Sequence, residues 1–382
     1  MVEQNVREKE INNNKIILII DSLVGGGAQR QMVLLAGQLK KAGYEPTILI
    51  YHELMDLLSE VNKNKIKLKL ISKSEMSWPN LFWSIAKFLK ERKPYAIISY
   101  LNTPNLIARI AGRLSGVDRI ITSQRNLDLF HSKIRCLFEQ LTKNLSSLMV
   151  TNSEANRELI IEKLGFDEKR VVTIYNGVDM SYFSTKNAKV RAGIRADWGV
   201  EENKFIFLLP GRMEKQKNHI ILVEAANIIE RNLKFKCVFV GHEFDQNIKS
   251  EASYRIKKYG LEDKFVFAGY SNNMPAVYSA SDVVVLPSLW EGLPNVVIEA
   301  LSCECPVIVS DVSDNSRIIS ENIGSVLPIN DIGALADAMT EYINMDRKQL
   351  KLMGARGRIR MKEICSLKSF KKKYVKLLQR QM

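Results

Sequence analysis

The stretch Ser288-Leu-Trp-Glu-Gly-Leu-Pro-Asn-Val-Val-Ile-Glu-Ala300 follows almost directly on Val283–Leu286, an aliphatic run that predicts a buried strand. Pro294 suits the first position of a helix, where its missing N–H leaves no hydrogen bond unmade. The segment therefore predicts a strand, a loop and a helix in succession, the repeating unit of a parallel α/β sheet. Glu291 lies in the loop and Glu299 about a turn and a half inside the helix, so we expect two carboxylates at different depths of one pocket.

The start of this predicted helix is suited to a phosphate group. The amides of Leu293, Asn295 and Val296, next to Gly292, lie at the positive end of the helix dipole. One glutamate could accept hydrogen bonds from a ribose while the other reaches the hydroxyls of a sugar. Taken as isolated acids, both glutamates would more often be solvated side chains, and that interpretation stays open here.

The same strand–helix rhythm extends over the whole chain and restarts after a polar stretch at residues 184–202. The predicted strands are Lys15–Ile20, Glu45–Tyr51, Lys65–Leu70, Tyr95–Ser99, Arg119–Thr122, Leu148–Thr151, Val171–Ile174, Phe205–Leu209, Phe235–Val240, Phe265–Ala268, Val283–Leu286 and Val307–Val309. We therefore predict two doubly wound α/β domains, residues 1–183 and 184–363, that face a central cleft at the carboxyl ends of both sheets. Residues 364–382 form a final helix.

Two further loops follow predicted strands. Gly25, Gly26 and Gly27 would let the backbone approach a phosphate, although a tight structural turn explains them equally well and the spacing is not G-x-G-x-x-G. Arg212 and Lys217 would repel each other in one loop unless an anion neutralises them. A planar donor fork beside a compact charge suits a diphosphate, and a solvated loop is the alternative.

These segments together resemble one enzyme family. The two glutamates form E-x7-E, and the other matches are Gly25-Gly-Gly-Ala28, Tyr175-Asn-Gly-Val-Asp179 and Gly211-Arg-x4-Lys217-Asn218. In this order they resemble the retaining, GT-B-type glycosyltransferases of family 4, including the bacterial enzymes of polysaccharide and lipid-linked oligosaccharide synthesis. The resemblance covers most of the chain and implies two Rossmann-like domains, with the C-terminal helix crossing back to the first. The N-terminal domain would bind the acceptor and the second the nucleotide sugar.

The resemblance also implies roles for these residues. Glu299 would hold the ribose and Glu291 the donor sugar, while Arg212 and Lys217 neutralise the diphosphate and the Gly25–Gly27 loop closes over it. We expect no cofactor and no metal, because side-chain cations and helix amides can stabilise the departing diphosphate. The anomeric configuration should be retained by a front-face mechanism. The donor should be UDP-linked and carry a hexose or N-acetylhexosamine.

One departure from the family pattern lies in the N-terminal domain. Many relatives carry a histidine near the acceptor, where this chain has Thr122-Ser-Gln-Arg-Asn126. The match places Arg125 and Asn126 at the site and leaves the general base unassigned.

The charge is distributed unevenly. The net charge is +14, yet Lys63–Lys143 alone holds 16 Lys and Arg against 5 Asp and Glu, and Ile364–Met382 adds six basic residues and no acidic one. The alternatives are a solvated surface or attraction to lipid headgroups, a diphosphate-linked acceptor or nucleic acid. We favour an anionic membrane surface that carries a polyprenyl-diphosphate-linked saccharide. The segment Trp78–Lys93, with Trp78, Phe82 and Trp83, could be an interfacial helix or could simply pack on the sheet.

The location of the protein is predicted from what the sequence lacks. The N-terminus has no apolar core of a secretory signal, and no stretch approaches the length of a membrane span. Five scattered cysteines indicate a reducing compartment, with no metal cluster around Cys303 and Cys305. We expect a cytoplasmic protein, peripheral on the inner face of the cell membrane.

Several rival functions remain to be compared. A nucleic-acid-binding protein would carry aromatic–basic modules or a recognition helix, and the sequence contains neither. A sugar-nucleotide epimerase, a phosphorylase or a transferase with a soluble acceptor keeps the fold. A nicotinamide oxidoreductase is disfavoured by the glycine spacing.

Overall fold

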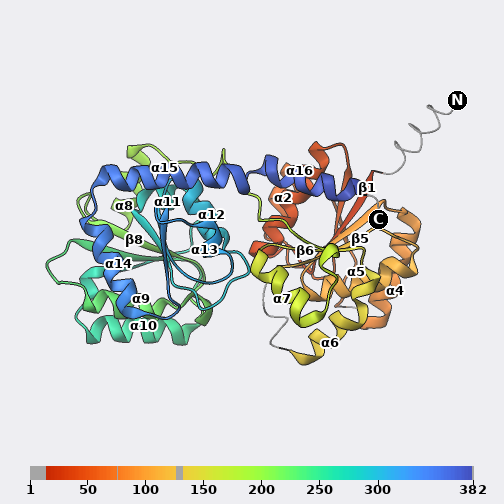
Figure 1. Cartoon of the computed structure of the whole chain (residues 1–382), viewed down its shortest axis with the longest axis horizontal. Coiled ribbons are helices and arrows are strands. Elements are labelled where there is room, and N and C mark those ends of the chain that lie inside the picture. Colours follow the sequence, from red (N-terminus) through yellow and green to blue (C-terminus); the bar gives the residue numbers. More distant parts are fainter. Residues whose placement is uncertain (1–13, 75, 126–131, 381–382) are drawn as a thin grey trace. The chain divides into compact units, whose positions relative to one another are not determined.

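The computed structural model describes residues 14–74, 76–125 and 132–380, and it contains two compact units (Figure 1). Unit 1 contains the chain up to Gly177 and resumes at Leu367, whereas unit 2 runs from Val178 to Ser366. Each unit is built on one sheet in which all strand pairs are parallel. The prediction of two doubly wound α/β domains is confirmed.

Unit 1 has a seven-stranded sheet of order β3-β2-β1-β4-β5-β6-β7. Its strands are β1 (Lys15–Ile19), β2 (Glu45–Ile50), β3 (Lys67–Leu70), β4 (Ala96–Tyr100), β5 (Ile120–Gln124), β6 (Leu148–Thr151) and β7 (Val171–Thr173). Its helices are α2 (Gly27–Lys41), α3 (Leu58–Lys63), α4 (Trp78–Arg92), α5 (Asn102–Leu114), α6 (Lys133–Thr142), α7 (Glu154–Leu164) and α16 (Leu367–Gln379).

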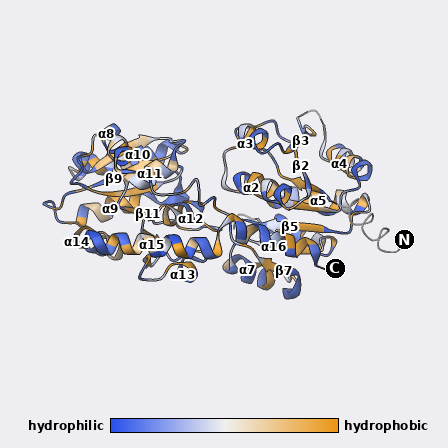
Figure 2. Cartoon of the chain, turned by 90° about the horizontal axis from the view of Figure 1, so that it is seen from above, coloured by the Kyte–Doolittle hydropathy of each residue, from blue (hydrophilic) through white to orange (hydrophobic). Residues whose placement is uncertain are grey.

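Alternate residues of these strands face opposite layers of helices. Ile16 and Leu18 of β1 pack in the core beneath α2 and α16, and Ile17 and Ile19 pack beneath α4 and α5. Strands buried on both faces are aliphatic throughout, which is why they could be recognised in the sequence. The hydropathy colours of Figure 2 show the same contrast between apolar strands and mixed helices.

The C-terminal helix α16 belongs to unit 1, as the family resemblance implies, and packs there through an apolar stripe. Phe370, Tyr374, Leu377 and Leu378 are all buried in the same core as α2. The Tyr374 hydroxyl lies 2.8 Å from the Tyr100 hydroxyl at the end of β4. The middle of this helix is therefore hydrogen-bonded to the carboxyl end of β4, and its last turn is hydrogen-bonded to Tyr95, just before β4.

Unit 2 has a six-stranded sheet of order β10-β9-β8-β11-β12-β13. Its strands are β8 (Phe205–Pro210), β9 (Phe235–Val240), β10 (Phe265–Gly269), β11 (Val283–Leu286), β12 (Val307–Ser310) and β13 (Gly324–Leu327). Its helices are α8 (Ala188–Asp197), α9 (His219–Ile228), α10 (Gln246–Lys258), α11 (Met274–Ala280), α12 (Asn295–Ser302), α13 (Asn315–Ile318), α14 (Ile332–Asn344) and α15 (Arg347–Ile364).

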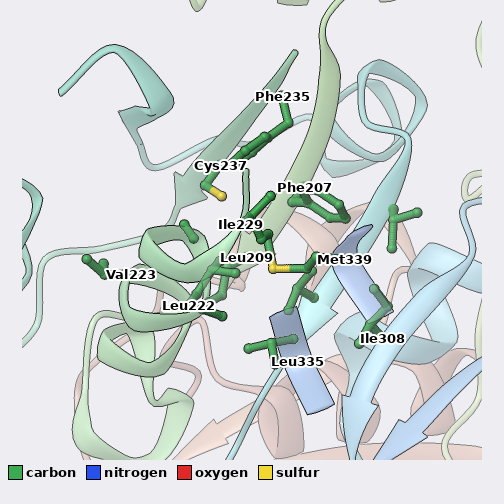
Figure 3. Packing of buried hydrophobic residues seen from close by; sticks show 14 of the residues in the cluster. Phe207, Leu209, Leu222, Val223, Ile229, Phe235, Cys237, Ile308, Leu335 and Met339 are labelled. Carbon is green, nitrogen blue, oxygen red and sulfur yellow. The ribbon is translucent and has the colours of Figure 1, made fainter. Parts of the chain in front are cut away.

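One face of this sheet packs against α9, α10 and α14. Phe207 and Leu209 of β8, Leu222 of α9 and Met339 of α14 interlock in this core (Figure 3). The edge strand β13 was not predicted, because it begins at a glycine and, with its other three residues only half-buried, does not present an aliphatic run.

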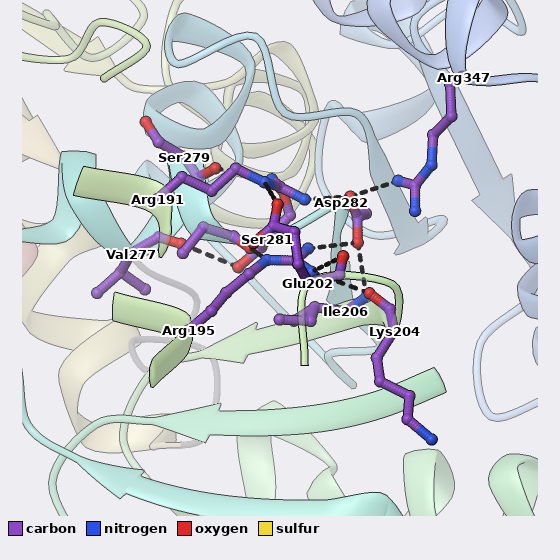
Figure 4. Close-up of polar contacts among 11 residues, drawn as sticks. Arg191, Arg195, Glu202, Lys204, Ile206, Val277, Ser279, Ser281, Asp282 and Arg347 are labelled. Carbon is purple, nitrogen blue, oxygen red and sulfur yellow. Dashed lines mark hydrogen bonds and ion pairs between the residues drawn. The ribbon is translucent and has the colours of Figure 1, made fainter. Parts of the chain in front are cut away.

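A charge cluster around the buried Asp282 attaches two helices to this sheet (Figure 4). The Asp282 carboxylate, just before β11, lies 2.9 Å from Arg191 and 2.8 Å from Arg195, both on α8, and 2.6 Å from Arg347 at the start of α15. It also accepts a hydrogen bond of 2.8 Å from the Ile206 amide of β8. Burial alone would raise the pKa of Asp282, but the arginines, Arg191 most strongly, and this amide lower it below its ordinary value.

Candidate active site

The predicted residues of unit 2 lie on two loops beside a topological switch point. The strand order reverses between β8 and β11, since β9 and β10 continue on one side and β12 and β13 on the other. Loops diverge at such a point, and α/β proteins bind ligands beside the carboxyl ends of the strands there. The loop after β8 carries Arg212 and Lys217, and the loop after β11 carries Glu291.

The first half of the β8 loop is fastened to the end of β9. Gly211 donates to the Val240 carbonyl at 2.8 Å, and Met213 donates to the His242 carbonyl at 2.9 Å. Gly241 adopts φ +159, and a Cβ there would lie 1.9 Å from the Gly211 oxygen. Glycine is therefore required at this close approach of two backbones.

Arg212 extends from this loop into solvent, with its side chain 55% exposed. Its guanidinium stacks 5.1 Å above the Phe244 ring and lies 3.2 Å from Glu214 Oε1. The stacking orients the planar fork, and the exposure leaves the fork accessible to an anion.

Lys217 and Glu291 form a buried ion pair across the two loops. Lys217 Nζ lies 2.6 Å from Glu291 Oε1, and Glu291 is only 6% exposed. Ser288 Oγ donates to the same carboxylate oxygen at 2.8 Å, and Gln216 Nε2 donates to the other at 3.1 Å. A buried carboxylate is stable only with such a full set of donors. The structure thus unites two predicted residues that lie far apart in the sequence.

Gln216 also joins the loops through their backbones. Its side chain donates to the Trp290 carbonyl at 2.7 Å, and its own carbonyl accepts from Leu289 at 2.9 Å. Gln216 and Ser288 were missed as site residues, although both lie within the recognised segments. No pattern of spacing singles out such supporting side chains before the two loops are known to touch.

The segment after Glu291 leads into α12. Pro294 is the residue that precedes the helix, not its first residue, so the predicted helix start was one residue too early. The reason is that Pro294 has an extended ψ of 110°, while its carbonyl accepts from the Val297 amide at 3.2 Å. Leu293 is buried, the Gly292 carbonyl accepts from Ser313, and Asn295 and Val296 open the helix with half-buried side chains.

Glu299 lies one turn further along α12. It accepts a hydrogen bond of 2.9 Å from the Tyr278 hydroxyl of α11. Burial, followed by the charge of Glu299, raises the pKa of Tyr278 well above its ordinary value, so the hydroxyl remains a donor. The Glu299 residue is half-buried on the helix, whereas Glu291 is buried in the loop before it.

In unit 1 the glycine loop connects β1 to α2. Gly26 precedes the helix, Gly27 is its first residue, and a Cβ at Gly26 would lie 2.4 Å from Gln29 Oε1. The Gly25 amide donates to Asp56 Oδ2 at 3.1 Å. The Asp56 carboxylate thus accepts from one of the backbone amides that the sequence analysis considered for a phosphate or for a tight structural turn.

Arg125 follows β5 and is almost fully buried. Its guanidinium stacks 4.3 Å from the Tyr100 ring and donates to Asn176, and its Nη1 has no hydrogen-bond partner within the described residues. Tyr374 of α16 completes this cluster through the Tyr100 hydroxyl. Asn126 lies outside the described residues.

Two histidines of unit 2 flank the loops that follow β8 and β9. His219, next to Lys217 in sequence, is buried, and burial followed by the charge of Lys217 lowers its pKa to about 3. His242 stacks on Tyr270 at 4.1 Å.

In the part of the chain that the structure describes, no three His, Cys, Asp or Glu side chains are grouped to hold a metal ion. None of the described helices is long and apolar enough to cross a bilayer.

Comparison with known proteins places the chain in a family. The profile described as "Glycosyl transferases group 1" matches residues 190–360, and "Glycosyltransferase Family 4" matches residues 25–182. The UDP-Gal:alpha-D-GlcNAc-diphosphoundecaprenol alpha-1,3-galactosyltransferase of Escherichia coli is 30% identical over 283 residues, 71% of each chain.

A second relative matches over almost the full length. The GalNAc-alpha-(1->4)-GalNAc-alpha-(1->3)-diNAcBac-PP-undecaprenol alpha-1,4-N-acetyl-D-galactosaminyltransferase of Campylobacter jejuni is 27% identical, over 93% of this chain and 96% of its own. Among solved structures, Anabaena HepE in complex with UDP and glucose superposes with a TM-score of 0.85 at 18% identity, covering 96% of this chain and 99% of HepE. At that identity the superposition establishes a shared fold. The chain belongs to the GT-B glycosyltransferases of family 4, and it is a transferase.

Proposed function

We propose that this protein transfers a hexose or N-acetylhexosamine from a nucleotide-diphosphate sugar to a saccharide linked to a polyprenyl diphosphate. The acceptor is suggested by the E. coli and C. jejuni relatives, both named for diphosphate-linked undecaprenol substrates. Within the chain, the observation that carries the proposal is the Lys217–Glu291 pair at the switch point of unit 2. A buried, fully hydrogen-bonded carboxylate held by a cation is a pre-organised group that can orient sugar hydroxyls.

The donor is proposed to be UDP-linked. This choice is supported by the UDP-Gal in the name of the E. coli relative and by the UDP bound in the HepE structure. The exposed fork of Arg212 and the ammonium of Lys217 would neutralise the diphosphate, together with the start of α12 at Leu293, Asn295 and Val296. Glu299 would accept from the ribose.

The reaction is proposed to retain the anomeric configuration and to need no metal. The bond from the anomeric carbon to the diphosphate breaks as the acceptor hydroxyl forms a new bond on the same face. The leaving diphosphate takes the hydroxyl proton, so no protein base is required. Arg212 and Lys217 stabilise the charge that develops on the diphosphate.

Unit 1 is proposed to bind the acceptor and to hold the protein at the inner face of the cell membrane. It contains 32 Lys and Arg against 18 Asp and Glu, a net charge of +14, whereas unit 2 contains 24 of each. The excess charge of the chain therefore lies in one unit and favours contact with anionic lipid and with the acceptor diphosphate. Arg125 and Asn126, with the Gly25–Gly27 loop, are the proposed site residues of this unit.

The proposal is tested by incubating the protein with a panel of nucleotide sugars and a short-chain polyprenyl-diphosphate-linked N-acetylhexosamine. Mass spectrometry should detect one added sugar with a single preferred donor. Slow hydrolysis of that donor alone would identify it independently of the acceptor. If no donor yields a product on a lipid-linked acceptor but a free saccharide is extended, the acceptor class is wrong.

Replacing Glu299 with alanine should weaken donor binding. The ribose would lose a charge-assisted hydrogen bond worth about 1.5–3 kcal/mol, so the dissociation constant should rise about tenfold or more. Calorimetric titration with UDP measures this directly. Unchanged affinity in a folded variant would remove Glu299 from the site.

Activity should persist in excess EDTA, because the proposed charge stabilisation comes from side chains and helix amides. Initial rates with and without the chelator are compared after dialysis. Complete loss that magnesium or manganese restores would contradict the proposed mechanism.

Replacing Arg212 with alanine should lower turnover about 100-fold, as expected when one transition-state donor is lost. The Arg212 side chain is mostly exposed and contributes little to folding stability, so the melting temperature should not change. Arg212→Lys should recover only part of the activity, because an ammonium lacks the planar fork. A variant with full turnover would show that Arg212 is a surface residue only.

A further inference from the structure

The helix α6 in unit 1 carries a stripe of exposed apolar side chains. Ile134, Leu137, Phe138 and Leu141 are 68%, 53%, 49% and 69% exposed. Their spacing of three, four and seven residues places them on one side of the helix. Contiguous apolar surface of this kind marks an interaction site more often than a free surface.

The orientation of α6 is fixed by its polar side. Glu139 faces inward and pairs with Arg109 of α5 at 2.6 Å, with both side chains almost fully buried. Arg109 also donates to Thr142 at 3.2 Å, and Cys136 packs on the small core formed by β6, β7 and α7. Turning the apolar stripe inward would break this ion pair and leave a buried charge without its partner. The exposed stripe is therefore a stable feature of the fold.

The charges on α6 indicate what covers the stripe. Lys133 and Arg135 are exposed on the same helix, while its single acidic residue, Glu139, is the buried one. The unit that carries α6 has a net charge of +14. An exposed apolar stripe flanked by cations, without exposed carboxylates, suits an anionic lipid surface better than a second copy of the same basic unit.

The helix α4, where tryptophans suggested an interfacial segment, is less suited to this role. Leu81, Ile85 and Leu89 form its buried side, and Phe82 packs against the same core. Two large apolar side chains of α4 are exposed, Trp83 at 70% and Trp78 at 46%. They are five residues apart, so they lie on different sides of the helix and do not form a stripe.

We propose that α6 lies in the interface of an anionic bilayer, with the stripe of Ile134, Leu137, Phe138 and Leu141 at the acyl boundary and with Lys133 and Arg135 among the headgroups. This proposal names the membrane contact that a lipid-linked acceptor would require, and in that respect it rests on the proposed function. The contact itself depends on α6 alone.

The test uses the full chain and a matched pair of double variants. Leu137→Gln with Leu141→Gln removes half of the stripe, and glutamine has a helix propensity close to that of leucine. The control is Leu352→Gln with Ile359→Gln, which changes two exposed apolar residues of α15, 55% and 59% exposed. This helix belongs to unit 2, whose net charge is zero. Equal melting temperatures show that both variants are folded.

Binding is measured by sedimentation with vesicles of phosphatidylglycerol and phosphatidylcholine. The wild type and the α15 control should bind equally. The partition constant of the α6 variant should be lower by a factor of about ten or more. Equal binding of all three proteins would overturn the proposal. A different outcome is that the wild type forms dimers that the α6 variant cannot form, while both proteins bind vesicles equally. That result would assign the stripe to a second copy of the chain and would also overturn the proposal.

An insertion signal gives a second measurement. Leu141→Cys labelled with an environment-sensitive dye should shift to shorter wavelength with anionic vesicles, whereas Ile359→Cys should not. The native cysteines Cys237, Cys303, Cys305 and Cys365 are buried and Cys136 is half-buried, so the introduced thiol is labelled preferentially. No shift at position 141 would contradict insertion.

Failure of this proposal is distinguishable from failure of the proposed reaction. With a water-soluble acceptor analogue and no vesicles, the α6 variant should transfer sugar at the wild-type rate. A wild type that binds vesicles through α6 but transfers no sugar would refute the reaction and leave the membrane contact standing.

Discussion

Replacing Lys217 with alanine should lower turnover about 1,000-fold, the upper range for removal of a single charge-stabilising group. The variant loses a cation at the proposed diphosphate site. It also leaves Glu291, which is 6% exposed, without its ion-pair partner. The carboxylate would then turn outward or take up a proton, so the group that is proposed to orient the sugar would be lost as well.

The two losses should not add. A double-mutant cycle compares Glu291→Gln, Lys217→Ala and the variant that carries both changes. The double variant should be about as slow as the slower single variant, because the pair acts as one unit. Lys249→Ala is the matched control, since Lys249 lies 2.6 Å from Glu243 in the same unit but the pair is 34% and 37% exposed. Initial rates at saturating donor measure the cycle. Additive losses would show that Lys217 and Glu291 act independently.

Replacing Asp282 with alanine should destabilise unit 2 by about 3–5 kcal/mol, because three arginines lose the carboxylate that neutralises them. For a unit of this size the melting temperature should fall by roughly 10 °C. Glu363→Ala is the matched control: its ion pair with Arg360 is 61% and 42% exposed, so its loss should cost less than about 0.5 kcal/mol. Thermal unfolding followed by circular dichroism compares the two. Similar stabilities would show that the cluster contributes nothing.

The contribution of Asp282 should also depend on pH in a defined direction. Since the folded state lowers the pKa of this carboxyl, its contribution is fully present above the unfolded pKa, which is close to 4. It is lost as the pH falls through the lower, folded value. The stability difference between the wild type and Asp282→Asn should therefore shrink in acid. A constant difference between pH 7 and the acid range would contradict this sign.

Much of the fold could be read from the sequence because parallel strands are buried on both faces. Ile16–Ile19 and Val283–Leu286 are uninterrupted aliphatic runs for that reason. The edge strand β13 begins with Gly324 and its other three residues are only half-buried, so it lacks this signal. The stripe of α16 was recognisable because its buried residues repeat with the helical period.

The site was predictable as a set of segments but not as a set of contacts. The pairing of Lys217 with Glu291 depends on the strand order, which places β8 beside β11 across a long sequence separation. The Gly25–Asp56 hydrogen bond likewise joins the loops after two neighbouring strands. For α6, periodicity reveals an amphipathic helix but not which side faces the sheet. Only the buried partner of Glu139 decides that its apolar side is the outer one.

The proposed reaction moves a sugar from a nucleotide-diphosphate donor to a lipid-diphosphate-linked saccharide with retention of the anomeric configuration. The most direct measurement is the anomeric proton coupling, by nuclear magnetic resonance, of the product formed from the preferred α-linked UDP-sugar and a short-chain polyprenyl-diphosphate-linked acceptor. We expect a new glycosidic linkage with the small coupling of an α-anomer. A β-linked product, or no linkage to the acceptor with any nucleotide sugar, would contradict this account.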